Sequence, residues 1–184
     1  MTKPKQTQNI WLMNDSQILT PTKWEILHKN LNPYYQIFGE ALLFSGLRPT
    51  ELRRYADNSH WRQSNKIVLP EIKNKQIPRV IPLSNEGRYA MEVFDLTMNT
   101  SGVRARENVH QALVRAVKRV NGDFAPIGIN ESMFRETWIA WLVACYPEKW
   151  DEIRSHMSCE PEEYKEITFD KKELASARKY TEGW

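Results

Sequence analysis

The side chain with the greatest reactive potential in this sequence is the phenol of Tyr164, within the stretch Pro-Glu-Glu-Tyr-Lys-Glu at 161–166. A phenol has an unperturbed pKa of about 10 and is a weak nucleophile while it is protonated. The glutamates on either side oppose its ionisation if they face it. Two arginines upstream, Arg48 and Arg135, carry forked N–H donors that match the oxygens of a phosphate, a geometry that lysine cannot supply. A phenol held beside them could attack a phosphodiester, so the question is which elements would bring them together.

Helical patterns cover most of the chain. Apolar residues recur at helical spacing, with capping residues and prolines at the ends of each run. Thr22 with Glu25 and Asp170 with Glu173 predict capping boxes, and Gly46 predicts a C-cap. We expect helices in the stretches 20–31, 32–46, 49–56, 84–98, 106–122, 130–147 and 170–184.

Two stretches have a different character. Residues 66–70 and 79–83 are short, rich in β-branched residues and separated by "EIKNKQIP", so they predict an antiparallel hairpin with lysines at its tip. The prolines in and beside them favour edge strands. The predicted fold class is therefore mainly α with a small antiparallel β-sheet (α+β). In this fold Arg48 falls at a junction between two helices, and Arg135 lies beside the apolar face of another.

Length and composition favour one domain, because 184 residues with 41% hydrophobic and 27% charged residues suffice for a single core. We expect residues 1–19 to form an extension and residues 20–184 the domain. The longest strongly apolar run, 138–146, is far shorter than the ~20 residues that span a bilayer. With no signal-peptide pattern and only two cysteines, we expect a cytoplasmic protein.

Charge is unevenly distributed along the chain. Residues 147–184 hold seven Lys/Arg against ten Asp/Glu, which leaves nineteen against thirteen in residues 1–146. A basic body is compatible with a polyanionic partner such as nucleic acid. The four histidines have no ligand-like spacing with each other or with the cysteines, so we expect no metal and no cofactor.

A resemblance to a known family rests on four separated pieces, "SGLRPTEL", "EIKNKQIPRVIPL", "SMFRETW" and "SHMSCEPEEY". In this order they resemble the catalytic domain of a tyrosine recombinase, the phage-integrase family. Its pattern is an arginine near a helix start, a lysine in a β-hairpin, a His-x-x-Arg helix, a His or Trp, and a nucleophilic tyrosine. The ending of the chain also resembles the tails of archaeal-type integrases. That match and the spacing from His156 favour Tyr164 over Tyr180 as the nucleophile.

The resemblance implies how four of these residues would act. Arg48 and Arg135 would hold the charge that develops on the non-bridging oxygens of a pentacoordinate phosphorane. His156 would donate a third hydrogen bond. Tyr164 would attack the phosphorus and become linked to a DNA 3′-phosphate, which conserves bond energy so that a 5′-hydroxyl can reverse the step.

Other positions are open or depart from the pattern. Lys73 on the hairpin would protonate the departing 5′-oxygen, and Lys75 is an alternative that the spacing does not separate from it. Ser132 stands where the family has the histidine of His-x-x-Arg, and it can hydrogen-bond a phosphate oxygen but cannot be a general base at neutral pH. Glu136 is interpreted as a surface charge or as a partner that orients one of the arginines.

The expected function is that of a metal-independent recombinase or integrase domain that cuts and rejoins double-stranded DNA and assembles on it as a homo-oligomer. Most family members have a second, N-terminal DNA-binding domain, which residues 1–19 are too short to form, so we expect weak, salt-dependent binding. Two alternatives stay open: a DNA-binding module of the same ancestry that does not cleave, and a type IB topoisomerase-like activity.

Overall fold

The computed structural model describes residues 18–70, 78–101, 109–121 and 129–184. Over these residues the protein is mainly helical with a small three-stranded antiparallel sheet, which confirms the predicted fold class. The α-helices are α1 (Pro21–Asn30), α2 (Pro33–Ser45), α3 (Pro49–Ala56), α4 (Asn85–Ser101), α5 (Val109–Asn121), α6 (Ser132–Cys145), α7 (Trp150–Met157) and α8 (Lys171–Thr181). Three short 3₁₀ helices are η1 (Ser59–Trp61), η2 (Pro147–Lys149) and η3 (Pro161–Tyr164).

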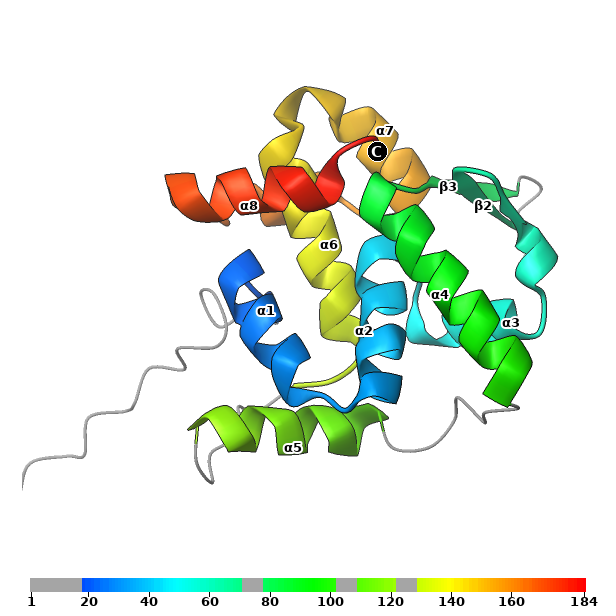
Figure 1. Ribbon diagram of the computed structural model, residues 1–184. Coiled ribbons are helices and arrows are strands. Elements are labelled where there is room, and N and C mark those ends of the chain that lie inside the picture. The colour runs from blue at the N-terminus through cyan, green and yellow to red at the C-terminus, as the bar shows by residue number, and fades with distance from the viewer. Residues whose placement is uncertain (1–17, 71–77, 102–108, 122–128) are drawn as a thin grey trace, which may run out of the picture.

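The core is built around α6 and α2. Figure 1 shows α6 passing through the middle of the molecule, with α2 beside it, α4 beyond α2, and α8 crossing α6. Helix α6 is apolar nearly all round and is buried along most of its length, with Trp138 and Trp141 inaccessible to solvent. Large aromatic side chains contribute most to core packing, so α6 is firmly anchored. Its first turns are the part that reaches the candidate site.

The helix ends follow the local sequence with one correction. Thr20, and not Thr22, caps α1, because its hydroxyl accepts a backbone N–H of the first turn at 3.3 Å. The predicted Thr22–Glu25 capping box is therefore wrong, and the Thr22 N–H donates instead to Glu173 at 3.0 Å. Asp170 caps α8, accepting the Glu173 N–H at 2.8 Å, which confirms this half of the predicted Asp170–Glu173 capping box.

The turn between α2 and α3 requires glycine. Gly46 ends α2 at φ +62°, in the left-handed region that glycine adopts without strain, which confirms the predicted C-cap. A Cβ at this position would lie 2.7 Å from Trp138 and 2.9 Å from Met157. Arg48 follows as the N-cap residue of α3, with Pro49 in the first helical position. Arg48 therefore lies at a helix junction, as predicted.

The sheet has the strand order β1-β2-β3, with antiparallel pairing throughout. β2 (Lys66–Leu69) and β3 (Arg79–Pro82) form the predicted hairpin, whose expected tip falls in residues 71–77, outside the described residues. β1 (Arg62–Gln63) was not predicted, because two residues are too few to carry an alternating pattern.

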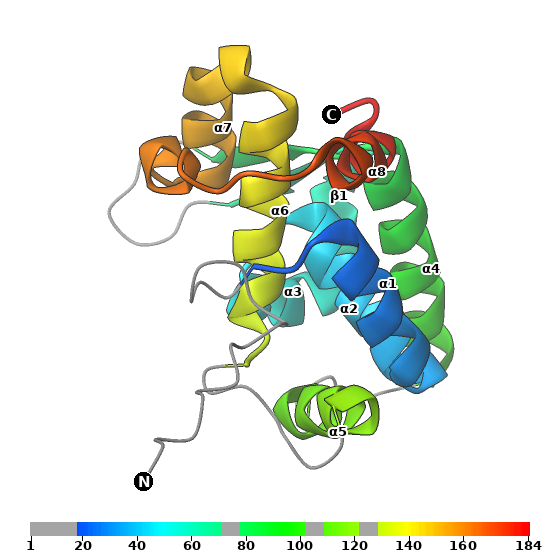
Figure 2. The same ribbon diagram turned by 90° about the vertical axis from the view of Figure 1, so that its left-hand side faces the viewer.

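Helix α7 was also not predicted, and it carries His156. It lies at the opposite end of the molecule from α5, as both views show (Figures 1 and 2), and it packs against β3 and α6. None of the helices in the described part of the chain is both long and apolar enough to span a bilayer.

Candidate active-site cleft

A cleft with a volume of about 610 Å³ lies between the first turn of α3, the first turns of α6 and the segment from the end of α7 to η3. It brings together four of the residues predicted from the sequence, Arg48, Ser132, Arg135 and Tyr164. Arg48 and Ser132 are more than eighty residues apart in the sequence, so tertiary packing brings them together. The remaining lining residues are Pro49, Thr50, Arg53, Glu131, Glu136, Ile139, Ser158, Cys159, Glu160 and Glu163.

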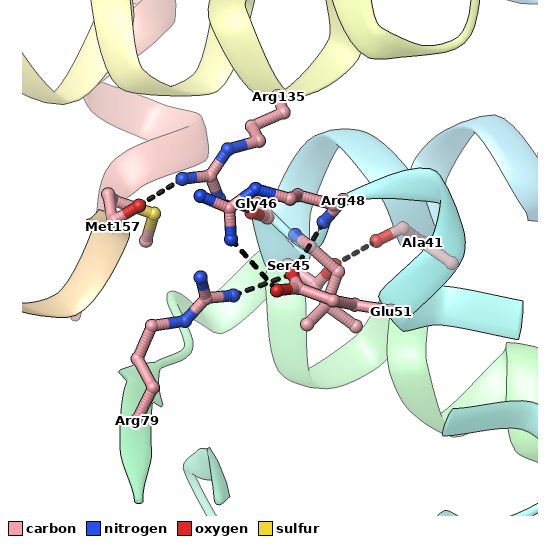
Figure 3. A network of polar contacts seen from close by, with 9 residues as sticks. Ala41, Ser45, Gly46, Arg48, Glu51, Arg79, Arg135 and Met157 are labelled. Carbon is pink, nitrogen blue, oxygen red and sulfur yellow. Dashed lines mark hydrogen bonds and ion pairs between the residues drawn. The ribbon is translucent and has the colours of Figure 1, made fainter. Parts of the chain in front are cut away.

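Arg135 is buried, with 6% of its surface exposed, and its guanidinium group is held by two backbone carbonyls. Nη1 donates to the Gly46 carbonyl at 2.5 Å, and Nη2 donates to the Met157 carbonyl (Figure 3). Burial, followed by the positive charges of Arg48 and Arg79, lowers the pKa of Arg135 to about 10, so it remains charged at neutral pH. The two carbonyls fix the guanidinium between the α2–α3 turn and the end of α7.

Arg48 is more open and is held by a carboxylate on its own helix. Its backbone N–H and its Nη1 both donate to Glu51, at 2.8 and 2.9 Å, in a capping arrangement at the start of α3. Glu51 is nearly inaccessible, whereas 43% of the Arg48 side chain is exposed. The guanidinium group of Arg48 is therefore oriented at one end and accessible to a ligand.

A third arginine, Arg79 at the start of β3, completes the cluster. Its Nη2 donates to Glu51 at 2.6 Å, so one carboxylate accepts from two guanidinium groups (Figure 3). Burial raises the pKa of Glu51, but the Arg48 N–H and Arg79 outweigh it and hold that pKa below its ordinary value. With Arg135 nearby, three guanidinium groups face a single carboxylate, and the local excess of positive charge favours an anion such as phosphate.

Tyr164 lies on η3 with 7% of its surface exposed, and its hydroxyl donates to Oε2 of Glu136. Glu136 is thus neither a free surface charge nor the carboxylate that orients an arginine, since Glu51 has that place; the earlier interpretation of Glu136 was wrong. Burial and the Glu136 carboxylate raise the pKa of Tyr164 well above its ordinary value, and the charge of Arg135 lowers it by less. The phenol is therefore protonated at neutral pH.

The other residues predicted from the sequence take no part in the hydrogen bond between Tyr164 and Glu136. His156 does not line the cleft; its Nδ1 lies 2.7 Å from the Val80 carbonyl on β3, and its ring meets Trp184 edge-on at 6.1 Å. Ser132 is exposed in the first turn of α6, where its N–H donates to the Asn130 side chain. Lys73 and Lys75 fall outside the described residues.

The Tyr164 hydroxyl bonds to Glu136 and not to the glutamates that flank it in sequence. Glu162 pairs with Arg154 on α7, and Glu163 and Glu166 are exposed. The lining nevertheless carries both charges, because Glu131 binds Arg53 at 2.6 Å and further carboxylates stand on the side of η3.

Two residues of the arginine cluster, Glu51 and Arg79, were not predicted from the sequence as part of the site. The spacing of Arg48 and Glu51, three residues apart on one helix, was a signal for their ion pair. No sequence signal pairs Arg79 with Glu51 or Tyr164 with Glu136, since both contacts join distant segments.

Comparison of the chain with known protein families, with curated proteins and with solved structures found no match in any of the three.

Proposed function

We propose that this chain is a tyrosine recombinase catalytic domain that cuts and rejoins double-stranded DNA through a 3′-phosphotyrosyl intermediate at Tyr164. The observation that carries the proposal is the cleft in which Arg48, Arg135 and Tyr164 meet. The sequence pattern selects these three positions without reference to their distances. A mainly helical fold with a small sheet is compatible with the catalytic domain of that family.

The chemistry follows from the types of side chain in the cleft. A phosphodiester bound against the arginine cluster would have its non-bridging oxygens facing Arg48 and Arg135, which stabilise the charge that grows in the transition state. Arg135 is preorganised by its two carbonyl contacts, so its orientation costs little when the phosphate arrives. Tyr164 is the nucleophile, and Lys73 or Lys75 protonates the leaving 5′-oxygen.

The partner in this proposal is duplex DNA, on which copies of the chain would assemble in the cytoplasm. The Val80 carbonyl can only accept, so Nδ1 of His156 carries the proton in that contact, and His156 would donate to a phosphate through Nε2 only as an imidazolium with both nitrogens protonated. That contact and the Arg79–Glu51 ion pair both start from β3, so the hairpin that would carry the general acid is tied to the arginine cluster and to His156.

A second candidate is a DNA-binding module of the same ancestry that does not cleave. The state of Tyr164 favours this candidate, because its hydroxyl donates to a carboxylate, and burial and that carboxylate raise its pKa. Ser132 in place of histidine also favours slow or absent catalysis, because loss of an assisting group typically costs ~10²- to 10⁴-fold.

The experiment that separates these candidates traps the covalent intermediate. A pool of short labelled duplexes of randomised sequence, each with one 5′-bridging phosphorothiolate, is incubated with the protein and resolved by denaturing electrophoresis. The sulfur leaving group needs no general acid, so even a slow enzyme accumulates adduct. The proposal predicts a covalent band for the wild type and for Tyr180→Phe, and none for Tyr164→Phe.

The remaining outcomes each have a meaning. Binding without any covalent band supports the non-cleaving module and contradicts the proposed enzyme. A band that persists in Tyr164→Phe excludes Tyr164 as the nucleophile. Relaxation of a supercoiled plasmid of unrelated sequence would favour the topoisomerase-like activity over site-specific recombination.

A further inference from the structure

We propose that Glu136 is the group that accepts the proton of Tyr164 as the tyrosine oxygen bonds to phosphorus. This inference rests on the proposed function and assigns it a catalytic residue. The sequence pattern places no carboxylate in this role, and Ser132, at the histidine position, cannot fill it at neutral pH.

The geometry begins on α6, where Arg135 and Glu136 are consecutive residues. Both side chains line the cleft, so one helical turn presents a cation and a carboxylate to the same space. The Tyr164 hydroxyl donates to Oε2 of Glu136, across the packed contact between η3 and α6. A general base must be within hydrogen-bond reach of the proton it removes, and Glu136 meets that requirement before any substrate binds.

The other groups that face Tyr164 are poorer acceptors. Arg135 has no acceptor atom. Burial raises the pKa of the Cys159 thiol to about 11, so this group stays protonated at neutral pH. Glu163 lines the cleft but is exposed, and Arg48 is cationic. Among the described residues, Glu136 is the carboxylate for which a hydrogen bond to this hydroxyl is found.

The step balances in atoms and charge. The Tyr164 oxygen forms a bond to phosphorus while its proton passes to Oε2 of Glu136, and the bond between phosphorus and the 5′-oxygen breaks. The departing 5′-oxygen takes a proton from the hairpin lysine ammonium, Lys73 or Lys75. In the reverse step a 5′-hydroxyl attacks phosphorus and gives its proton to the now neutral lysine, while the bond between phosphorus and the tyrosine oxygen breaks and Glu136 returns its proton to that oxygen.

The same contact explains why the resting phenol is inert. A carboxylate that accepts the hydroxyl proton favours the neutral phenol, together with burial, so ionisation before attack is unfavourable. The proton moves only when phosphorus withdraws charge from the oxygen and the arginines stabilise the transition state. Glu136 therefore acts during bond formation and not by ionising Tyr164 beforehand.

The test compares single-turnover adduct formation on the phosphorothiolate duplex pool for the wild type, Glu136→Gln, Glu136→Asp and Glu166→Gln. Because the sulfur leaving group needs no acid, the rate reports on proton removal from the nucleophile. We expect Glu136→Gln to slow the reaction by ~10²- to 10⁴-fold. Glu136→Asp should recover part of the rate, because it restores a carboxylate. Glu166→Gln removes one exposed charge close to Tyr164 in sequence but outside the cleft lining, and it should leave the rate unchanged.

The two substitutions distinguish a proton acceptor from a residue that only packs. Glu136→Gln keeps the size of the side chain and loses the carboxylate, whereas Glu136→Asp keeps the carboxylate.

Two outcomes separate the inference from the proposed function. An adduct that disappears in Tyr164→Phe while Glu136→Gln reacts at the wild-type rate overturns only the role of Glu136. An adduct that persists in Tyr164→Phe, or never forms, overturns both. Circular dichroism of Glu136→Gln shows whether it is folded. If it is not, Glu136→Asp decides: a reduced rate, with Glu166→Gln at the wild-type rate, supports the role because the shorter side chain moves the carboxylate away from the hydroxyl, and a wild-type rate for Glu136→Asp contradicts it.

Discussion

Tyr164 and Tyr180 make the same local contact in different surroundings. Each hydroxyl donates to a glutamate, Tyr164 to Glu136 and Tyr180 to Glu25, and burial followed by carboxylate charge raises both pKa values. Tyr164 lies in a cleft where the charge of Arg135 lowers its pKa. Tyr180 lies on α8, where it is partly buried and packs against the core.

Aromatic rings, and not cations, surround Tyr180. Its ring stacks on Phe44 at 5.3 Å and on Trp141 at 5.4 Å, joining α8 to α2 and α6. A stacked ring of this kind contributes to stability, and Tyr180 does not line the cleft. A phenol–carboxylate hydrogen bond therefore does not by itself mark a reactive tyrosine, and the proposed role of Tyr164 rests on the neighbouring arginines and the cleft.

Removing an arginine from the cleft should strongly reduce adduct formation. Arg48→Ala should reduce adduct formation by at least ~10²-fold, because it removes a donor that faces the developing charge. Single-turnover kinetics measure the loss, and Arg88→Ala, an exposed arginine on α4, is the control for lost charge. Adduct formation by Arg48→Ala at the wild-type rate would mean that the cluster does not bind the phosphate.

Arg48 is a cleaner test than Arg135. Arg135→Ala should also abolish the adduct, but it leaves the buried Gly46 and Met157 carbonyls without their donor and should cost ~2–4 kcal/mol of stability. Urea denaturation separates the two effects.

Truncating each tyrosine should lower the free energy of unfolding by different amounts. Tyr180→Ala removes a ring packed between two others and should lower the free energy of unfolding by ~3 kcal/mol. Tyr164→Ala should cost less, because no aromatic ring is found stacked on Tyr164 in the described part of the chain. Urea unfolding of both variants measures the difference. A larger loss for Tyr164→Ala would mean that Tyr164, and not Tyr180, contributes more to stability, which contradicts the prediction.

The smallest expected effect concerns Glu51, whose folded-state pKa is held below its unfolded value. A depressed carboxyl pKa adds stability above the unfolded value, near 4.3, and that contribution is lost as the pH falls through the folded value. Glu51→Gln should therefore lower stability at pH 7 by ~1–3 kcal/mol. The difference from the wild type should shrink below about pH 4.5 in denaturation curves recorded across pH. An equal difference at all pH values would contradict the assigned ion pairs.

Local sequence signals predicted most of the fold. Gly46, Pro49 and Asp170 marked helix ends where the structure has them, and the apolar face of α6 identified the central core helix. These features depend on a residue and its near neighbours along the chain. Thr22 failed as a cap because Thr20, two residues earlier, already fills that position.

The site was less predictable than the fold. The sequence order suggested that Arg48, Arg135 and Tyr164 belong together, and the cleft contains all three. The contacts that tune them, Arg79 with Glu51 and Glu136 with Tyr164, join segments that tertiary packing alone brings together. A helix surface position such as Glu136 carries no local mark that distinguishes a solvated glutamate from one bound to a phenol.

The most direct test of the central claim is to identify the residue that carries DNA in a trapped adduct. Trypsin cuts after Arg154 and Lys165, which releases Tyr164 in the peptide 155–165, and after Lys179, which releases Tyr180 in the peptide 180–184. After nuclease digestion, mass spectrometry should find the residual nucleotide on Tyr164 in peptide 155–165. A nucleotide on Tyr180 or on any other residue would contradict the account.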